Sequence, residues 1–287
     1  MMAARVVVSL ALALLVQTPA FHAETRLVVL HATVRNSHGE VITNLDRQAF
    51  TVYENGRPQP IKVFRRDDIP VSLGLVIDNS GSMRPVRARV EAAALAFARA
   101  SNPLDQMFVL NFADKVRIDV PFTSDVAVLE AGIARVDSIG GTAMRDAVEA
   151  AESYLNDHAA RERKVLLVIT DGNDNASAAS LERIRQTAEQ REIAVYAIGL
   201  FGDPSGARVA HRELDQLAER GLAYYPPSIE AVDDVALDIA RQIRRQYTLA
   251  YAPLNQALDG SYRSIRVAVA GPERFSVRTR TGYRAVK

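Results

Sequence analysis

The 287-residue sequence contains no cysteine. This absence excludes disulfides, thiolate nucleophiles, zinc sites built on thiolates and a lipid-modified cysteine after a leader. The sequence also lacks an excess of charge of either sign, since 35 lysines and arginines stand against 34 aspartates and glutamates. Without a block of basic residues, this balance argues against a nucleic-acid-binding protein.

Long apolar runs are scarce, and the run at the amino terminus is short. Arg5 precedes the apolar stretch Val6 to Val16, and small residues follow it. This arrangement predicts a secretory signal peptide over residues 1–23, with cleavage after Ala20 or Ala23. An uncleaved signal anchor is the alternative, although a membrane span needs about 20 apolar residues. No other segment is apolar enough to cross a membrane, so we expect a periplasmic or secreted mature protein.

The rest of the chain is long enough for more than one domain, and its hydrophobic pattern changes twice. Residues 24–68 alternate as strands do, with a turn signal at Asn55-Gly56. Residues 69–245 predict an α/β domain with a doubly wound, mostly parallel sheet. Residues 246–287 return to strand-like alternation. Neither flanking segment can bury a good core alone, so we expect them to pair into a smaller β-sandwich-like domain with the α/β domain inserted between them.

Within residues 69–245, apolar strands alternate with amphipathic helices. The predicted strands cover Val71 to Ile77, Met107 to Phe112, Lys164 to Thr170 and Ile193 to Leu200. The predicted helices cover Val86 to Ala100, Asp125 to Val136, Ala143 to His158, Ser180 to Arg191, Arg212 to Arg220 and Ile229 to Arg245.

Oxygen-bearing side chains follow two of these strands. Asp78, Ser80 and Ser82 come directly after the first strand, and Gly81 permits a tight bend between the two hydroxyls. Asp171 comes directly after the strand that ends at Thr170. Because ligands of open parallel sheets bind at the carboxyl ends of the strands, both carboxylates should meet at one edge of the sheet.

Thr142 is the fifth candidate, since it follows two glycines at a predicted helix start and offers a hydroxyl there. Each of these residues has a simpler interpretation as well. Asp and Ser favour turns and helix caps, and Thr142 could serve only as an N-cap. The recurrence of such residues after matching elements favours a shared site over separate caps.

The combined pattern resembles the metal-ion-dependent adhesion site of von Willebrand factor type A domains. The matching motifs are D-x-S-x-S at 78–82, Gly-Gly-Thr at 140–142 and T-D-G at 170–172. Segments 50–56, 246–251 and 280–283 also resemble bacterial secreted proteins related to this family. The resemblance implies a divalent cation, usually Mg²⁺ with Mn²⁺ or Ca²⁺ as alternatives, for which Ser80 and Ser82 are direct ligands and the remaining ligands bind directly or through water. The implied ligands are Asp78, Ser80, Ser82, Thr142 and Asp171.

Two carboxylates would neutralise a divalent cation and leave a position for an Asp or Glu of a protein partner, since the hydroxyl ligands carry no charge. We therefore expect a non-enzymatic, metal-dependent adhesion or protein-binding module. One alternative is a Mg²⁺-dependent hydrolase of the phosphatase type, which would want a carboxylate where Ser80 stands. Another is binding by the β domain beside a vestigial metal site.

Other polar and aromatic residues are expected to lie outside the site. We interpret Asp174 and Asn175 as solvated loop residues, because Asp and Asn are common in turns. The histidines, His211 among them, show no metal-ligand spacing. The segment 224–227 is interpreted as a strand that ends in a loop.

Overall fold

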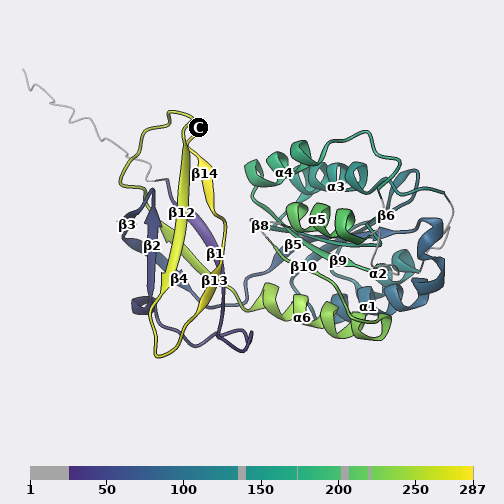
Figure 1. Ribbon diagram of the computed structural model, residues 1–287, viewed down its shortest axis with the longest axis horizontal. Coiled ribbons are helices and arrows are strands. Elements are labelled where there is room, and N and C mark those ends of the chain that lie inside the picture. Colours follow the sequence, from purple (N-terminus) through teal and green to yellow (C-terminus); the bar gives the residue numbers. More distant parts are fainter. Residues whose placement is uncertain (1–25, 135–139, 173, 202–206, 219–220, 287) are drawn as a thin grey trace, which may run out of the picture.

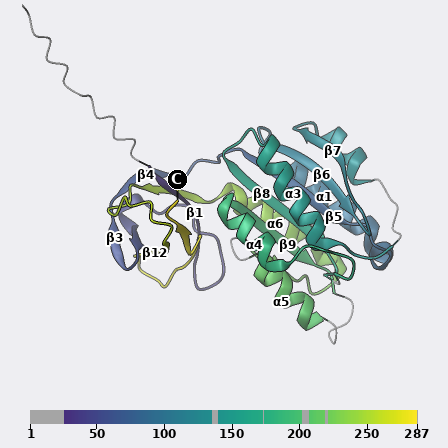
Figure 2. The ribbon, with the colours of Figure 1, turned by 90° about the horizontal axis from the view of Figure 1, so that it is seen from above.

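The computed structural model describes residues 26–134, 140–172, 174–201, 207–218 and 221–286. The expected signal peptide over residues 1–23 lies outside this part of the chain. The described residues form a β-rich unit and an α/β unit that lie next to each other (Figure 1 and Figure 2). The expected fold class, an α/β sheet domain with an additional β-rich region, is confirmed.

The α/β unit is built on one sheet that has six strands in the described residues, in the order β10-β9-β8-β5-β6-β7. Neighbouring strands run parallel except β6 and β7. The strands are β5 (Val71–Asp78), β6 (Gln106–Phe112), β7 (Val116–Thr123), β8 (Arg163–Thr170), β9 (Ile193–Gly199) and β10 (Ala223–Tyr224).

Helices cover both faces of this sheet. In Figure 1, α3 and α4 lie above the sheet, and α1 and α6 lie below it. The helices are α1 (Arg87–Ala100), α2 (Val126–Ile133), α3 (Met144–His158), α4 (Leu181–Gln190), α5 (Ala207–Leu217) and α6 (Val232–Arg244). Short 3-10 helices, η2 (Gly81–Val86) and η3 (Ile229–Ala231), precede α1 and α6. A further one, η1 (Arg47–Ala49), precedes β2.

The central strand β5 shows why both faces are filled. Leu75 and Ile77 belong to the core shared with α1, α2 and α6, whereas Val76 belongs to the core shared with α3, α4 and α5. Gly74 faces the second core, where an added Cβ would meet the Phe108 ring at 2.3 Å. A strand that is buried on both faces has a continuous apolar sequence, which is why the bounds of β5 and β8 were predicted closely.

Two elements depart from the sequence prediction. Strand β7 was not predicted, because it is an edge strand whose exposed positions interrupt the apolar pattern. Helix α5 begins at Ala207, five residues before the predicted start at Arg212. The predicted end of α2 at Val136 lies outside the described residues, and the described helix ends at Ile133.

The β-rich unit draws strands from both sides of the α/β unit. Its two sheets have the orders β13-β1-β11-β4 and β14-β12-β2-β3 in the described residues. In the first sheet Leu30 lies opposite Leu249, and in the second Val52 lies opposite Val267. The strands are β1 (Val28–Arg35), β2 (Phe50–Glu54), β3 (Arg57–Gln59), β4 (Ile61–Arg65), β11 (Tyr247–Tyr251), β12 (Tyr262–Val269), β13 (Ser276–Arg278) and β14 (Gly282–Arg284).

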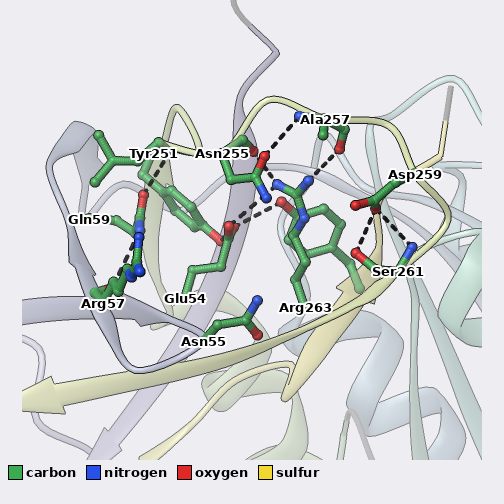
Figure 3. Close-up of polar contacts among 12 residues, drawn as sticks. Glu54, Asn55, Arg57, Gln59, Tyr251, Asn255, Ala257, Asp259, Ser261 and Arg263 are labelled. Atoms are coloured by element: carbon green, nitrogen blue, oxygen red, sulfur yellow. Dashed lines mark hydrogen bonds and ion pairs between the residues drawn. The ribbon is translucent and has the colours of Figure 1, made fainter.

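A buried ion pair ties together the second sheet and the loop before β12 (Figure 3). Arg263 lies 3.4 Å from Glu54, and both side chains are buried. Glu54 also accepts hydrogen bonds from the Tyr251 and Tyr283 hydroxyls at 2.7 and 2.9 Å. Arg263 further donates to the backbone carbonyls of the loop at residues 255 and 257. These contacts fix the path of this loop.

Polar contacts join the β-rich unit to the edge of the large sheet where its parallel strands begin. Arg163, the first residue of β8, donates to the Ile243 carbonyl at 2.6 Å and to Gln246. Gln246 in turn donates to Thr33 and to Tyr196 at 2.9 and 3.1 Å. The opposite edge, where the parallel strands end, therefore faces away from the β-rich unit.

Candidate metal centre

Asp78 lies at the carboxyl end of β5 with its carboxylate buried between strands. One oxygen accepts the backbone N–H of Ser80 at 2.8 Å. The other accepts the hydroxyl of Thr170, the last residue of β8, at 2.6 Å. Asp78 is fully buried, so these hydrogen bonds hold its carboxylate in one orientation at the edge of the sheet.

Ser80 and Ser82 direct their hydroxyls toward each other, with 3.0 Å between the Oγ atoms. Ser80 is buried and Ser82 is exposed. Ser80 is the N-cap residue of η2, yet its side chain makes no capping hydrogen bond. The capping explanation for these serines is therefore wrong, and the two hydroxyls form a pair that leads from the buried carboxylate toward solvent.

Thr142 is buried in the loop before α3. Helix α3 begins at Met144 and its N-cap residue is Ala143, so the alternative role of Thr142 as an N-cap is wrong. The backbone N–H of Thr142 donates to the Asn175 side chain at 2.9 Å, and the Asn175 N–H donates to the Thr142 carbonyl at 3.0 Å. These reciprocal bonds hold the loop that carries Thr142 against the loop that follows Asp171.

The three loops that carry the candidate ligands are linked pairwise. Gly81 N–H donates to the Gly140 carbonyl at 3.3 Å, which joins the first loop to the second. Asn175, in the loop after β8, binds the loop that carries Thr142. Thr170, at the end of β8, binds Asp78 at the start of the loop that carries Ser80 and Ser82. The structure thus brings chain-distant segments together at the edge where the parallel strands end, as the sequence predicted.

The electrostatics of this edge suit a cation. The pKa of Asp78 is raised to about 6, mainly because of its burial; hydrogen bonds from Thr170 and Ser80 lower this pKa, and repulsion by Asp171 adds to the rise. Asp171 is itself largely buried. Two carboxylates beside neutral hydroxyls are the oxygen ligands that hard divalent cations prefer. Among the described residues no three His, Cys, Asp or Glu side chains gather as a metal site, so a cation here would rely on hydroxyls as well.

Several residues that shape the site were not predicted from the sequence. Asp174, expected in solvent, accepts the N–H of Arg145 at 2.8 Å and pairs with its guanidinium at 3.2 Å. Asn175 is exposed in its loop, as expected, although its side chain also accepts the Thr142 N–H at 2.9 Å. The expectation of a solvated residue is wrong for Asp174, because its side chain is buried. Their partners lie about thirty residues away in sequence, and no local pattern indicates such pairing.

Asp114, which lies just after β6, supports the loop that contains Gly140 and Gly141. Its carboxylate accepts the Gly141 N–H. Gly140 has φ 100°, and an added Cβ would lie 2.1 Å from the Asp114 carboxylate. Glycine is therefore required at position 140 for both its backbone conformation and its close approach.

Comparison with known proteins agrees with this geometry. Residues 73–173 match the model of the von Willebrand factor type A domain family. This match lies within the α/β unit, so the expected resemblance to von Willebrand factor type A domains is confirmed. No curated protein matches the sequence.

Solved structures share the fold at low sequence identity. A von Willebrand factor type A protein from Catenulispora acidiphila is 13% identical with a TM-score of 0.54, and the match covers 93% of this chain and 75% of that one. The proximal thread matrix protein 1 of the mussel byssus, with a zinc-occupied MIDAS motif, is 20% identical with a TM-score of 0.54, covering 67% of this chain and 50% of that one.

The von Willebrand factor domain of the type V pilus tip protein Mfa5 from Porphyromonas gingivalis is 14% identical with a TM-score of 0.51. That match covers 62% of this chain and 97% of the other. At these identities the likenesses show a shared fold. The first of them extends beyond the α/β unit into the β-rich unit.

Proposed function

We propose that this protein is a metal-ion-dependent binding module that recruits a protein partner through a divalent cation at the edge where the parallel strands end. The observation that carries the proposal is the pairwise linkage of three loops around two carboxylates and three hydroxyls. The zinc-occupied MIDAS motif of the mussel protein supports a divalent cation in such a domain. We propose Mg²⁺, because an oxygen-only ligand set with room for water suits it.

Each proposed ligand has a distinct part in this site. Asp78 and Asp171 supply the negative charge, and the hydrogen bonds from Ser80 and Thr170 keep Asp78 in place. Ser80, Ser82 and Thr142 add neutral oxygens, so the charge of the ligand set balances that of a divalent cation. When bound, the cation would offer an open coordination position to a carboxylate oxygen. Exposed Ser82 marks the side from which a partner's Asp or Glu would approach.

We further propose that the module acts by binding and not by catalysis, and that it works in the periplasm or outside the cell. The residue two positions after Asp78 is Ser80, where a phosphatase-type mechanism would want a second carboxylate. A pilus-tip protein among the structures with this fold supports an extracellular binding role. In the described part of the chain, no helix combines the length and the apolar character needed to cross a membrane.

Calorimetric titration of the full chain with Mg²⁺ tests the ligand set. Ser82→Ala and Asp171→Asn should each weaken Mg²⁺ binding, by about tenfold or more, since each removes a proposed ligand or its charge. Ser276→Ala, an exposed serine of β13, is the matched control and should bind Mg²⁺ as the unaltered protein does. Equal affinities in all four proteins would refute the assignment.

A further inference from the structure

Three aromatic rings gather beside the candidate metal centre, at the ends of the next two strands of the sheet. Phe201 follows β9, Tyr225 follows β10, and His211 lies on α5. The His211 and Tyr225 rings stack with 3.9 Å between centroids and 4° between planes. Phe201 lies 4.4 Å from His211 and 5.6 Å from Tyr225. The rings therefore form one continuous aromatic wall.

Two glycines allow this wall to lie directly against the sheet edge. An added Cβ on Gly199 would meet the Phe201 and Tyr225 rings at 2.7 and 2.9 Å. An added Cβ on Gly172 would meet the Phe201 ring at 2.7 Å. Because Gly172 directly follows Asp171, the aromatic wall begins next to a proposed metal ligand. The two features therefore share one surface.

The wall lines a hollow of about 830 Å³, a size typical of binding pockets. Arg208 and Arg212 on α5 line the same hollow with exposed side chains, and within the described residues neither forms an ion pair. A third guanidinium, that of Arg185, is held by Glu182 at 3.1 Å. The acidic residue at the hollow, Asp215, accepts the Tyr225 hydroxyl at 2.8 Å. The hollow thus combines an apolar wall with an excess of positive charge.

We propose that this hollow is a second subsite for the same partner, and that it takes an aromatic side chain flanked by a carboxylate in an acidic peptide segment. The inference rests on the proposed function, because the metal centre would hold one acidic residue of the segment while the hollow holds its neighbours. The ring wall offers stacking to a planar side chain. The arginines of α5 offer charge-assisted hydrogen bonds to a carboxylate.

Titration of the ¹⁵N-labelled full chain with the peptide acetyl-Glu-Gly-Phe-Asp-amide in saturating Mg²⁺, followed by NMR, tests the proposal. Amide shifts are expected at Gly199, His211 and Tyr225. The double variant Arg208→Gln/Arg212→Gln should bind the peptide about tenfold more weakly, as should a peptide with Ala in place of Phe. The control variant Arg99→Gln/Arg241→Gln, which changes exposed arginines on other helices, should bind it unchanged.

A chelator arm separates this proposal from the metal proposal. With EDTA, weaker shifts confined to the hollow should remain, and they should disappear in the Arg208→Gln/Arg212→Gln variant. If these shifts persist with EDTA and the peptide binds equally tightly with and without Mg²⁺, the metal proposal is overturned and the subsite is supported. Equal affinity of the unaltered protein and this variant for the peptide would overturn the subsite, even where Mg²⁺ strengthens binding. Sedimentation showing a dimer that the same variant abolishes would also overturn it, with a second copy as the occupant.

Discussion

Glu152 on α3 should make the stability of this protein depend on pH in an unusual direction. Its side chain is fully buried, and both carboxylate oxygens lack a hydrogen-bond partner within the described residues. Burial raises the pKa of Glu152 from 4.5 to about 8, with Arg191 lowering it and Glu149 raising it. The folded protein therefore keeps a proton on Glu152 at pH values where the unfolded chain has lost it.

The sign and size of the effect follow from this difference. Between about pH 5 and pH 8 the unfolded state binds fewer protons at this residue, so the free energy of unfolding falls as pH rises. Each unit of pKa difference corresponds to about 1.4 kcal/mol. The contribution of Glu152 should therefore become less favourable by about 2.5 kcal/mol between pH 5 and pH 7. Above the raised pKa the loss levels off.

Urea unfolding of the unaltered protein and of Glu152→Gln at both pH values measures this contribution. The variant cannot ionise, so its stability relative to the unaltered protein should be higher at pH 7 than at pH 5 by about 2.5 kcal/mol. Other titrating groups cancel in the difference. Glu182→Gln, an exposed glutamate on α4, is the control and should show no such change. A relative stability of Glu152→Gln that is the same at both pH values would refute the reasoning.

Four further predictions address packing, the buried ion pair, the cation and the division of the chain. Gly74→Ala should lower the free energy of unfolding by about 3 kcal/mol, because the new methyl group overlaps the packed core, and an unchanged urea midpoint would contradict this. Arg263→Met should cost about 4 kcal/mol in the same assay, since it leaves the Glu54 carboxylate buried without its cation. The exposed Arg266→Met should cost less than about 1 kcal/mol, and equal losses would argue against a special role for the pair. Mg²⁺ at about a hundred times its dissociation constant should stabilise the protein by about 2.7 kcal/mol, seen as a raised melting temperature that EDTA reverses, and an unmoved transition would count against a cation site. Residues 69–245 expressed alone should unfold cooperatively in urea, whereas a non-cooperative transition would argue against an independent domain.

The sequence predicted the parts of the fold whose burial is uniform. Strands β5 and β8 are covered on both faces, so their apolar runs end where the strands end, and the carboxylates that follow lie where the topology requires. Edge strand β7 was not predicted, because the exposed residues Arg117, Ile118 and Pro121 interrupt its apolar pattern. The start of α5 was placed too late because its first turn carries no regular apolar pattern.

Contacts between segments that are distant in the sequence could not be predicted from local sequence patterns. Asp174 and Asn175 look like ordinary turn residues until α3 and the glycine loop are placed beside them. The same holds for His211 and Tyr225, whose stacking depends on α5 folding back over the ends of β9 and β10. The candidate metal ligands could be named because each follows a strand or precedes a helix. The residues that orient them could not, since their partners are defined only by the tertiary structure.

The α/β unit leaves the β-rich unit through β4 and returns to it through β11, and these two strands lie side by side in one sheet. A pulling force applied at the candidate metal centre would therefore be shared by two covalent links, which are anchored in adjacent, hydrogen-bonded strands. Such a double attachment resists torsion between the units better than a single tether. A ligand held at the distal edge would thus keep a defined rotational setting relative to the β-rich unit, even under tension.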